Sequence, residues 1–182
     1  MKNKFLLLTW LLAVPLLWGG CDKPLFKPDR SSIAQPNELP PITTTGEGNF
    51  ACKINGVNWQ RCGGGFLQSS ILGNWSPNYK IFQLGAKREC SGFDETISIN
   101  AIVDSAGTYP LEMADFNDFN LECQDVLDPY VLLEGADNWV EILNLDTKEF
   151  IVSGTFQCTL VHEGCGDTLF ITDGRFDYDW AN

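Results

Sequence analysis

The chain has 182 residues, with 24 acidic and 12 basic side chains and a formal net charge of −12. An acidic surface of this kind repels phosphate backbones and anionic lipid headgroups, so the composition predicts no nucleic-acid partner. We attribute the acidity to solubility, and the binding of divalent cations is the more specific alternative.

The N-terminus has the pattern of an export signal. Lys2 and Lys4 precede an apolar run from Phe5 to Trp18. A basic start followed by a short apolar region is typical of a secretory signal peptide. The run is shorter than the roughly 20 residues that a membrane-spanning helix needs. We therefore predict that residues 1–20 are a lipoprotein signal peptide and are removed, which brings the net charge near −14, with 10 basic and 24 acidic side chains left.

The segment Leu17-Trp18-Gly19-Gly20-Cys21 resembles a bacterial lipobox, although Trp18 stands where an aliphatic residue is usual. The resemblance implies cleavage before Cys21 and attachment of fatty acyl chains such as palmitate to this cysteine. Several acyl chains hold a protein firmly, because each buried methylene contributes about 0.8 kcal/mol. We expect a protein of the bacterial cell envelope, lipid-anchored at the outer membrane. The alternative is ordinary signal-peptidase cleavage with Cys21 as a plain thiol, but no Ala-x-Ala site precedes it.

Residues 21–45 are predicted to form the lipid anchor and a flexible tether. This segment is rich in proline and has almost no periodic apolar pattern, which is typical of a linker. From residue 46 to residue 182, apolar residues alternate with polar ones, and Gly and Asn residues separate the alternating segments. We predict one β-rich, disulfide-containing domain over 46–182, which is long enough to bury a core.

The domain begins with the pattern of a hairpin. Asn55-Gly56 lies between the apolar segments 50–54 and 57–59, and this dipeptide favours the positive φ angles of a type I′ turn. Alternating apolar residues predict further strands over 97–103, 150–160 and 176–180. Together these patterns predict an all-β fold with a single antiparallel β-sandwich-like domain.

The last predicted strand changes phase at Asp173-Gly174. Leu169 and Ile171 alternate in one phase, and Phe176, Tyr178 and Trp180 alternate in the other. An extra residue at a β-bulge near Gly174 would turn both sets toward the core. The alternative is a straight strand that is buried on both faces.

One segment departs from the strand pattern. Phe116, Phe119, Cys123 and Val126 have helical spacing, and acidic residues lie between them. The spacing predicts a short amphipathic helix near 115–127 that ends before Pro129, with an irregular loop as the alternative.

The cysteines indicate an oxidising compartment. Seven are present, and acylation of Cys21 would leave an even number that can pair in up to three disulfides, with 15 possible connectivities. No two have the Cys-x-x-Cys spacing of a zinc site, so we predict no metal site. The disulfide candidates are Cys52, Cys62, Cys90, Cys123, Cys158 and Cys165.

Two blocks of residues, one at each end of the domain, have a specific pattern. The first block is Asn49-Phe50-Ala51-Cys52-Lys53-Ile54-Asn55-Gly56-Val57-Asn58-Trp59, preceded by Leu39-Pro40-Pro41-Ile42-Thr43 and Gly46. The second is Ser153-Gly154-Thr155-Phe156, followed by Cys165-Gly166-Asp167-Thr168-Leu169-Phe170-Ile171-Thr172-Asp173-Gly174-Arg175-Phe176-Asp177. Together the two blocks resemble a family of small bacterial envelope lipoproteins whose β-rich domain has no assigned function. The resemblance implies an envelope location and a β fold, and it carries no catalytic residues.

Similar envelope proteins carry O-linked glycans at Asp-Ser/Thr-apolar triplets. Asp104-Ser105-Ala106 and Asp167-Thr168-Leu169 have this form. Ser105 and Thr168 are therefore candidate glycosylation sites, although a triplet of this kind also arises by chance.

Catalytic patterns are weak in this sequence. His162 is the only histidine, and we place it as a solvated residue in the loop before the last strand rather than as a base for a nucleophile. Paired carboxylates for glycoside hydrolysis exist among Asp115–Asp128 and at Asp173, Asp177 and Asp179, but spacing in three dimensions decides their role. Residues 115–120 begin like a calcium loop and fail at Phe119 and Asn120. We predict no catalytic residues and no cofactor.

Trp75 is the candidate ligand contact, since we place Gly73–Pro77 in a loop where an exposed tryptophan would need a reason. Its alternative role is a lid over the core.

The sequence therefore leaves two hypotheses. The favoured one is a non-enzymatic binding or interaction module. Its partner is an unknown protein or glycan, and its lipid anchor binds the membrane. The other is a glycan-active hydrolase that uses two carboxylates.

Overall fold

A computed structural model describes residues 37–63, 69–118, 129–164 and 166–181. These residues form ten β-strands in antiparallel pairings. The strands are β1 (Asn49–Ile54), β2 (Val57–Gln60), β3 (Ile71–Ser76), β4 (Ile81–Arg88), β5 (Glu95–Ile102), β6 (Gly107–Asp118), β7 (Tyr130–Leu132), β8 (Trp139–Asp146), β9 (Ile151–His162) and β10 (Asp167–Asp179).

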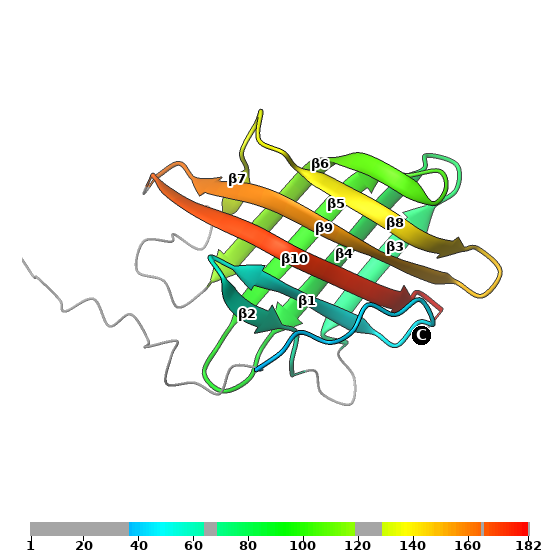
Figure 1. Ribbon diagram of the computed structural model, residues 1–182, viewed down its shortest axis with the longest axis horizontal. Coiled ribbons are helices and arrows are strands. Elements are labelled where there is room, and N and C mark those ends of the chain that lie inside the picture. The colour runs from blue at the N-terminus through cyan, green and yellow to red at the C-terminus, as the bar shows by residue number, and fades with distance from the viewer. Residues whose placement is uncertain (1–36, 64–68, 119–128, 165, 182) are drawn as a thin grey trace, which may run out of the picture.

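The strands make two layers that cross each other (Figure 1). One layer holds β3, β4, β5 and β6, and the other holds β1, β10, β9 and β8. Side chains from the two inner faces meet between the layers, where Phe82 stacks on Phe176 with ring centroids 5.3 Å apart. The prediction of an all-β antiparallel fold is confirmed.

The fold is not a plain sandwich, because four strands close into a small barrel. The first part of β6 pairs with β8, and its last part pairs with β7. Strand β9 likewise pairs with β8 and then with β7. Since β6 and β9 are both 12 residues long, each has room for two partners on one edge, and the ring β6–β7–β9–β8 closes.

Local sequence signals account for the first hairpin and the bulge. Asn55 and Gly56 connect β1 and β2 with φ angles of 49° and 80°, as the Asn-Gly dipeptide predicts. In β10 the pairing register shifts between Ile171 and Gly174. Leu169, Ile171, Phe176 and Tyr178 are all buried, so the predicted bulge is confirmed.

The predicted helix near 115–127 is wrong for the part of it that the structure describes. Asp115–Asp118 form the end of β6, and residues 119–128 lie outside the described residues. Ala114, Phe116 and Asp118 are buried while the residues between them are partly exposed. This is the two-residue period of a strand, and pairing with β5 on one side and β7 on the other fixes it. Across the described ranges, no helix has both the length and the apolar character of a membrane span.

One of the expected disulfides is present among the described cysteines. Cys62 and Cys90 are bonded, with Cα atoms 5.9 Å apart. Cys52 and Cys158 are buried free thiols, which corrects the expectation of a disulfide for these two. They lie on β1 and β9, the two neighbours of β10. Two strand spacings amount to about 9.6 Å, beyond the Cα separation that a disulfide spans. Cys21, Cys123 and Cys165 lie outside the described residues.

The segment 37–48 is held against the domain, although we predicted a flexible tether up to residue 45. The buried carboxylate of Asp177 accepts hydrogen bonds from the backbone N–H groups of Thr45, Gly46 and Glu47 at 2.7–3.2 Å. Arg175 donates to the carbonyl of Pro40 at 2.9 Å. Among the described residues, contacts with the domain therefore extend back at least to Pro40, and the sequence pattern missed them because they join residues 130 or more positions apart. The predicted signal peptide at 1–20 lies outside the described residues.

Candidate functional site

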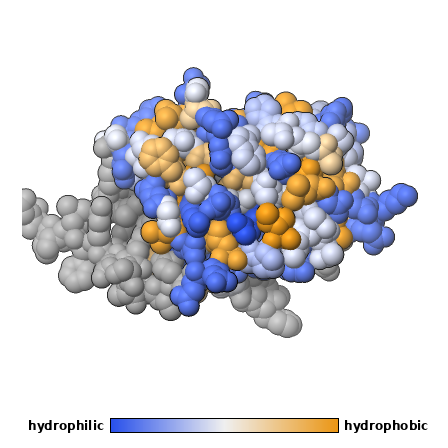
Figure 2. All heavy atoms as spheres, viewed as in Figure 1, coloured by the Kyte–Doolittle hydropathy of each residue, from blue (hydrophilic) through white to orange (hydrophobic). Residues whose placement is uncertain are grey.

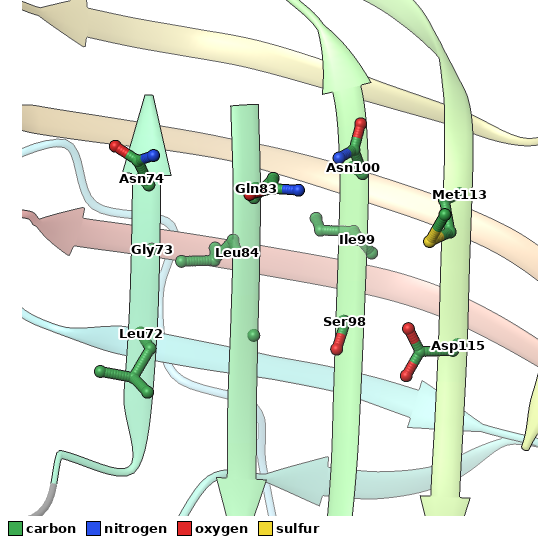
Figure 3. Close-up of a pocket in the computed structure, with 11 residues that line it drawn as sticks. Leu72, Gly73, Asn74, Gln83, Leu84, Ser98, Ile99, Asn100, Met113 and Asp115 are labelled. Atoms are coloured by element: carbon green, nitrogen blue, oxygen red, sulfur yellow. The ribbon is translucent and has the colours of Figure 1, made fainter. Parts of the chain in front are cut away.

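A shallow groove of about 410 Å³ runs over the outer face of the β3–β6 layer (Figure 3). We call it the outer groove. Its floor and walls come from four consecutive strands. The residues that line it are Leu72, Gly73, Asn74, Gln83, Leu84, Gly85, Ser98, Ile99, Asn100, Met113 and Asp115.

Strand register places the outward side chains of the outer groove in rows. Asn74 on β3 is opposite Gln83 on β4, which is opposite Asn100 on β5, and Met113 on β6 follows. Figure 3 shows the amides of Gln83 and Asn100 turned toward each other. A second row, two residues along each strand, consists of Leu72, Gly85, Ser98 and Asp115.

The alternation of burial explains why these side chains face outward. Along β4, Phe82 and Leu84 are buried while Gln83 is exposed. Along β5, Ile97 and Ile99 are buried while Ser98 is half-buried between them. Successive residues of a strand point to opposite faces of the sheet, so burying the apolar set in the core leaves the polar set on the outer face.

Gly85 makes the hollow in the second row. A Cβ atom built on it would lie 3.7 Å from both the carbonyl oxygen of Ile97 and the hydroxyl of Ser98, and its nearest other neighbour would be 3.9 Å away. These are ordinary van der Waals distances, so the packing does not require glycine here. A glycine inside a strand costs roughly 0.5–1 kcal/mol relative to alanine, and such a glycine often marks a place where a ligand approaches closely.

Asp115 is the single carboxylate among the residues that line the outer groove. Burial raises the pKa of this carboxyl, and a hydrogen bond from Ser98 partly opposes the shift. In Figure 3 the carboxylate of Asp115 points toward the hydroxyl of Ser98. The carboxylate is therefore an oriented hydrogen-bond acceptor at one end of the second row.

A second hollow of about 330 Å³ continues the outer groove toward the end of β4. It shares Leu72, Gly85, Ser98 and Asp115 with the first and adds Lys87, Thr96 and Asn117. The amine of Lys87 lies 2.9 Å from the carboxylate of Glu89 and 3.4 Å from that of Asp94. These two carboxylates compensate the positive charge of Lys87, so the lysine offers no free cation to an anionic ligand in the groove.

Trp75 lies in β3, not in a loop as predicted, and it is partly buried against the core. Its indole N–H donates to the carbonyl of Val103 at 3.1 Å, and its ring lies 6.4 Å from that of Trp180. Leu72 and Asn74 of the same strand face the outer groove. Trp75 directly follows Asn74, so its side chain lies on the opposite face of the strand.

The two candidate glycosylation residues differ in exposure. Ser105 is exposed in the turn before β6, where its hydroxyl lies 3.3 Å from the carboxylate of Asp104 and 3.2 Å from the hydroxyl of Tyr109. Thr168 is half-buried in β10, beside Asp167. Neither residue is among those that line the outer groove.

His162 is buried at the end of β9, which corrects its predicted place in a solvated loop. Its ring meets that of Tyr130 edge to face at 5.2 Å, and the hydroxyl of Tyr130 donates to Asp167 at 2.9 Å. The alternation of β9 continues two residues further than we predicted, from Leu160 to His162, and this brings His162 to the inner face.

Two buried acids face each other on the inner face of the sheet. Glu95 and Asp118 are opposite each other in β5 and β6, and both are buried. A carboxylate oxygen of Glu95 accepts from the indole N–H of Trp59 at 2.6 Å and lies 3.8 Å from the guanidinium of Arg88. Arg88 also stacks over the ring of Phe93 at 3.6 Å. These contacts make Glu95 part of a buried ion pair that joins β2, β4 and β5.

The remaining predicted acids and thiols have structural surroundings. Asp173 pairs with Lys53 at 2.6 Å, and Asp179 accepts from the backbone N–H of Ala181. Burial raises the pKa of Cys158 to about 12 and that of Cys52 well above its usual value, so both thiols stay protonated. Within the described ranges no three His, Cys, Asp or Glu side chains come together as a metal site.

The opposite surface of the molecule belongs to the layer that contains β10. Figure 2 shows apolar side chains scattered among hydrophilic ones over the layer that contains β10.

Comparison with known proteins gives no lead to the site, since no family model, no curated protein and no solved structure matches the chain. The sequence analysis missed the outer groove, although two signals pointed to it, the polar residues Ser98 and Asn100 in a strand and a glycine inside another strand.

Proposed function

We propose that the chain is a non-enzymatic binding module of the bacterial cell envelope and that the outer groove is its binding site. The observation that carries the proposal is Gly85. Its position accepts a Cβ atom without a clash, yet it has no side chain, and the side chains that line the resulting hollow are mostly polar. A glycine inside a strand destabilises the sheet slightly relative to alanine. Space for a bound ligand explains why this position has no side chain.

The chemistry of the outer groove supports binding over hydrolysis. Hydrolysis of a glycoside by two acids needs two carboxyl groups about 5–10 Å apart that face the same bond. The residues that line the groove include Asp115 as their one carboxyl group. Glu95 and Asp118 lie on the inner face, where they are buried, and a substrate in the groove would be separated from them by the sheet.

The anchor is proposed on the sequence pattern at Cys21. If the mature chain begins with an acylated Cys21, residues 22–36 connect the lipid to the domain. The connection ends at residue 36 because the carbonyl of Asn37 accepts a hydrogen bond from Asn58 of the domain. A fully extended chain of this length spans at most about 50 Å. The tether is therefore shorter than the tether of 21–45 predicted from the sequence.

The anchor is tested by growing bacteria that express the full chain with an alkyne-labelled palmitate and by mass spectrometry of the mature N-terminus. The label is expected on the wild-type chain and absent from Cys21→Ala. A soluble, unlabelled chain that begins at another residue would refute the envelope assignment and leave the groove proposal intact.

The outer groove is tested with the non-lipidated full-length mature chain, made by Cys21→Ser, on arrays of glycans, peptides and lipids. Gly85→Tyr fills the hollow and is expected to weaken any specific binding at least tenfold. Leu143→Tyr is the matched control, since it adds a ring at a partly exposed position of β8. Retained binding in Gly85→Tyr would show that the groove is not the site. Appearance of hydrolysis products by mass spectrometry would favour the enzyme.

A further inference from the structure

We infer that the outer groove binds a neutral glycan chain that lies across strands β3 to β6. This inference rests on the proposed function and adds the chemical class of the ligand. Four observations carry it: the amide row, the apolar ends of the rows, the balance of charge and the position of the groove on a sheet face.

The amide row matches the hydrogen-bonding chemistry of sugar hydroxyls. The side chains of Asn74, Gln83 and Asn100 each present a carbonyl acceptor and an NH₂ donor, and the register aligns them on neighbouring strands. Adjacent strands are about 4.8 Å apart, so a chain that crosses the strands meets one amide at each step. A hydroxyl group both donates and accepts, and it can therefore pair with either end of each amide.

Each row ends in one apolar side chain that is exposed to solvent, Met113 in the first row and Leu72 in the second. Leu72 on β3 is 68% exposed, and Met113 on β6 is 60% exposed. They lie on the two outer strands of the layer, on either side of the hollow at Gly85. A sugar ring has apolar C–H faces as well as hydroxyl edges, and burying those faces against Leu72 and Met113 removes apolar surface from water.

The charges around the outer groove disfavour anionic ligands. Asp115 is the one carboxylate of its lining, and the chain carries a net charge of −12. The nearest cation that borders the hollow, Lys87, is already held by Glu89 and Asp94. A phosphate or uronate group would meet repulsion without a compensating cation, whereas a neutral sugar would use Asp115 as an acceptor for a hydroxyl.

The position of the groove disfavours an extended peptide. A peptide that adds to a sheet gains affinity from main-chain hydrogen bonds at a free strand edge. Of the strands that line the outer groove, β4, β5 and β6 are paired on both sides, and β3 at the border of the groove is paired with β4 alone among the described strands. A ligand on this face therefore meets side chains, and the amides that it meets are suited to hydroxyl groups.

The inference is tested by NMR titration of the ¹⁵N-labelled Cys21→Ser mature chain with four probes. These are linear hexasaccharides of glucose, of mannose and of galacturonic acid, and an uncharged decapeptide. We expect at least one neutral hexasaccharide to move the side-chain amide signals of Asn74, Gln83 and Asn100 and the galacturonate hexasaccharide to leave them unchanged. Signals are assigned from Gln83→Ala and Asn100→Ala, and each variant is expected to weaken binding about tenfold.

Gln157→Ala is the matched control, because Gln157 is an amide on β9 that bonds to Asp137 and lies outside the groove. A dispersed backbone spectrum shows that each variant is folded. Binding of the galacturonate or of the peptide in the groove would overturn the glycan inference and leave the proposed function standing. The absence of groove shifts with both neutral hexasaccharides at millimolar concentration would also overturn it. If a probe shifts signals elsewhere and Gly85→Tyr does not affect its binding, both proposals fall.

Discussion

The two faces of the β3–β6 layer contain similar residues in opposite situations. Gly73 faces the interior, where a Cβ atom would lie 2.7 Å from the side chains of Leu84 and Tyr178, whereas Gly85 faces the outer groove with no contact closer than 3.7 Å. Glu95 is buried on the inner face beside Arg88 and Trp59, whereas Asp115 faces the groove. The same residue types therefore serve packing on one face and leave a ligand-sized space on the other.

This difference shows which features of a strand are explained by folding. Gly73 and Glu95 have close partners that require them, so stability accounts for both. Gly85 has no such partner, and burial disfavours the charge of Asp115. Residues that stability does not explain are expected at functional sites, and both of these face the outer groove.

The largest expected effect comes from removing the inner carboxylate. Glu95→Ala leaves Arg88 buried without this partner and removes the acceptor of Trp59, so the free energy of unfolding should fall by about 3–5 kcal/mol. Lys80→Ala is the control, since it breaks an exposed ion pair with Asp104 and should cost less than about 1 kcal/mol. Urea denaturation followed by tryptophan fluorescence measures both. Equal losses would remove the contrast between the buried and the exposed pair.

The next effect is expected at the inner glycine. Gly73→Ala forces a methyl group against Leu84 and Tyr178, which are both buried. Overpacking of this kind costs about 1–3 kcal/mol. The change is measured by the same urea denaturation, and a variant as stable as the wild type would show that the interior has room at Gly73.

The outer glycine is expected to respond in the opposite direction. Gly85→Ala meets no clash and reduces the conformational freedom of the unfolded chain, so stability should rise by about 0.5–1 kcal/mol. The midpoint of thermal unfolding, compared with that of Gly73→Ala, gives the sign directly. A loss of stability in Gly85→Ala would mean that the position is needed for packing, and the main support for the binding site would disappear.

The smallest effect is expected at Asp115, and it depends on pH. Burial raises the pKa of this carboxyl in the folded chain, so the folded state binds the proton more tightly than the unfolded state does. Stability is then lost as pH rises from the usual Asp pKa of about 3.9 through the raised value. Asp115→Asn should therefore be more stable than the wild type at pH 7 and should lose this advantage at pH 3. An equal difference at both pH values would contradict the shift.

Local patterns were sufficient for several elements of the fold. Asn55-Gly56 fixed a hairpin because two adjacent residues determine the turn, and the phase change at Gly174 indicated the bulge because alternation is a property of one strand. The pattern around Phe116 was ambiguous, since apolar residues at short range fit either period. Pairing with Ile97 and Tyr130 decided for the strand.

The candidate site was less predictable than the fold. Trp75 attracted attention because it is a large aromatic residue near glycine and proline, but its neighbour Asn74 faces the outer groove. Which of two adjacent residues faces outward depends on which face of the strand the core covers. Gly85 was not distinguishable from a packing glycine such as Gly73 until their neighbours were known.

The sequence by itself determined that the chain folds into antiparallel strands and where some of them turn or bulge, because these features depend on residues next to each other. The tertiary structure alone decided the closure of β6–β9 into a barrel, the pairing of Cys62 with Cys90 and the assembly of the outer groove. Each of these depends on which strands become neighbours and in which register, and that is set by contacts between segments far apart in the chain.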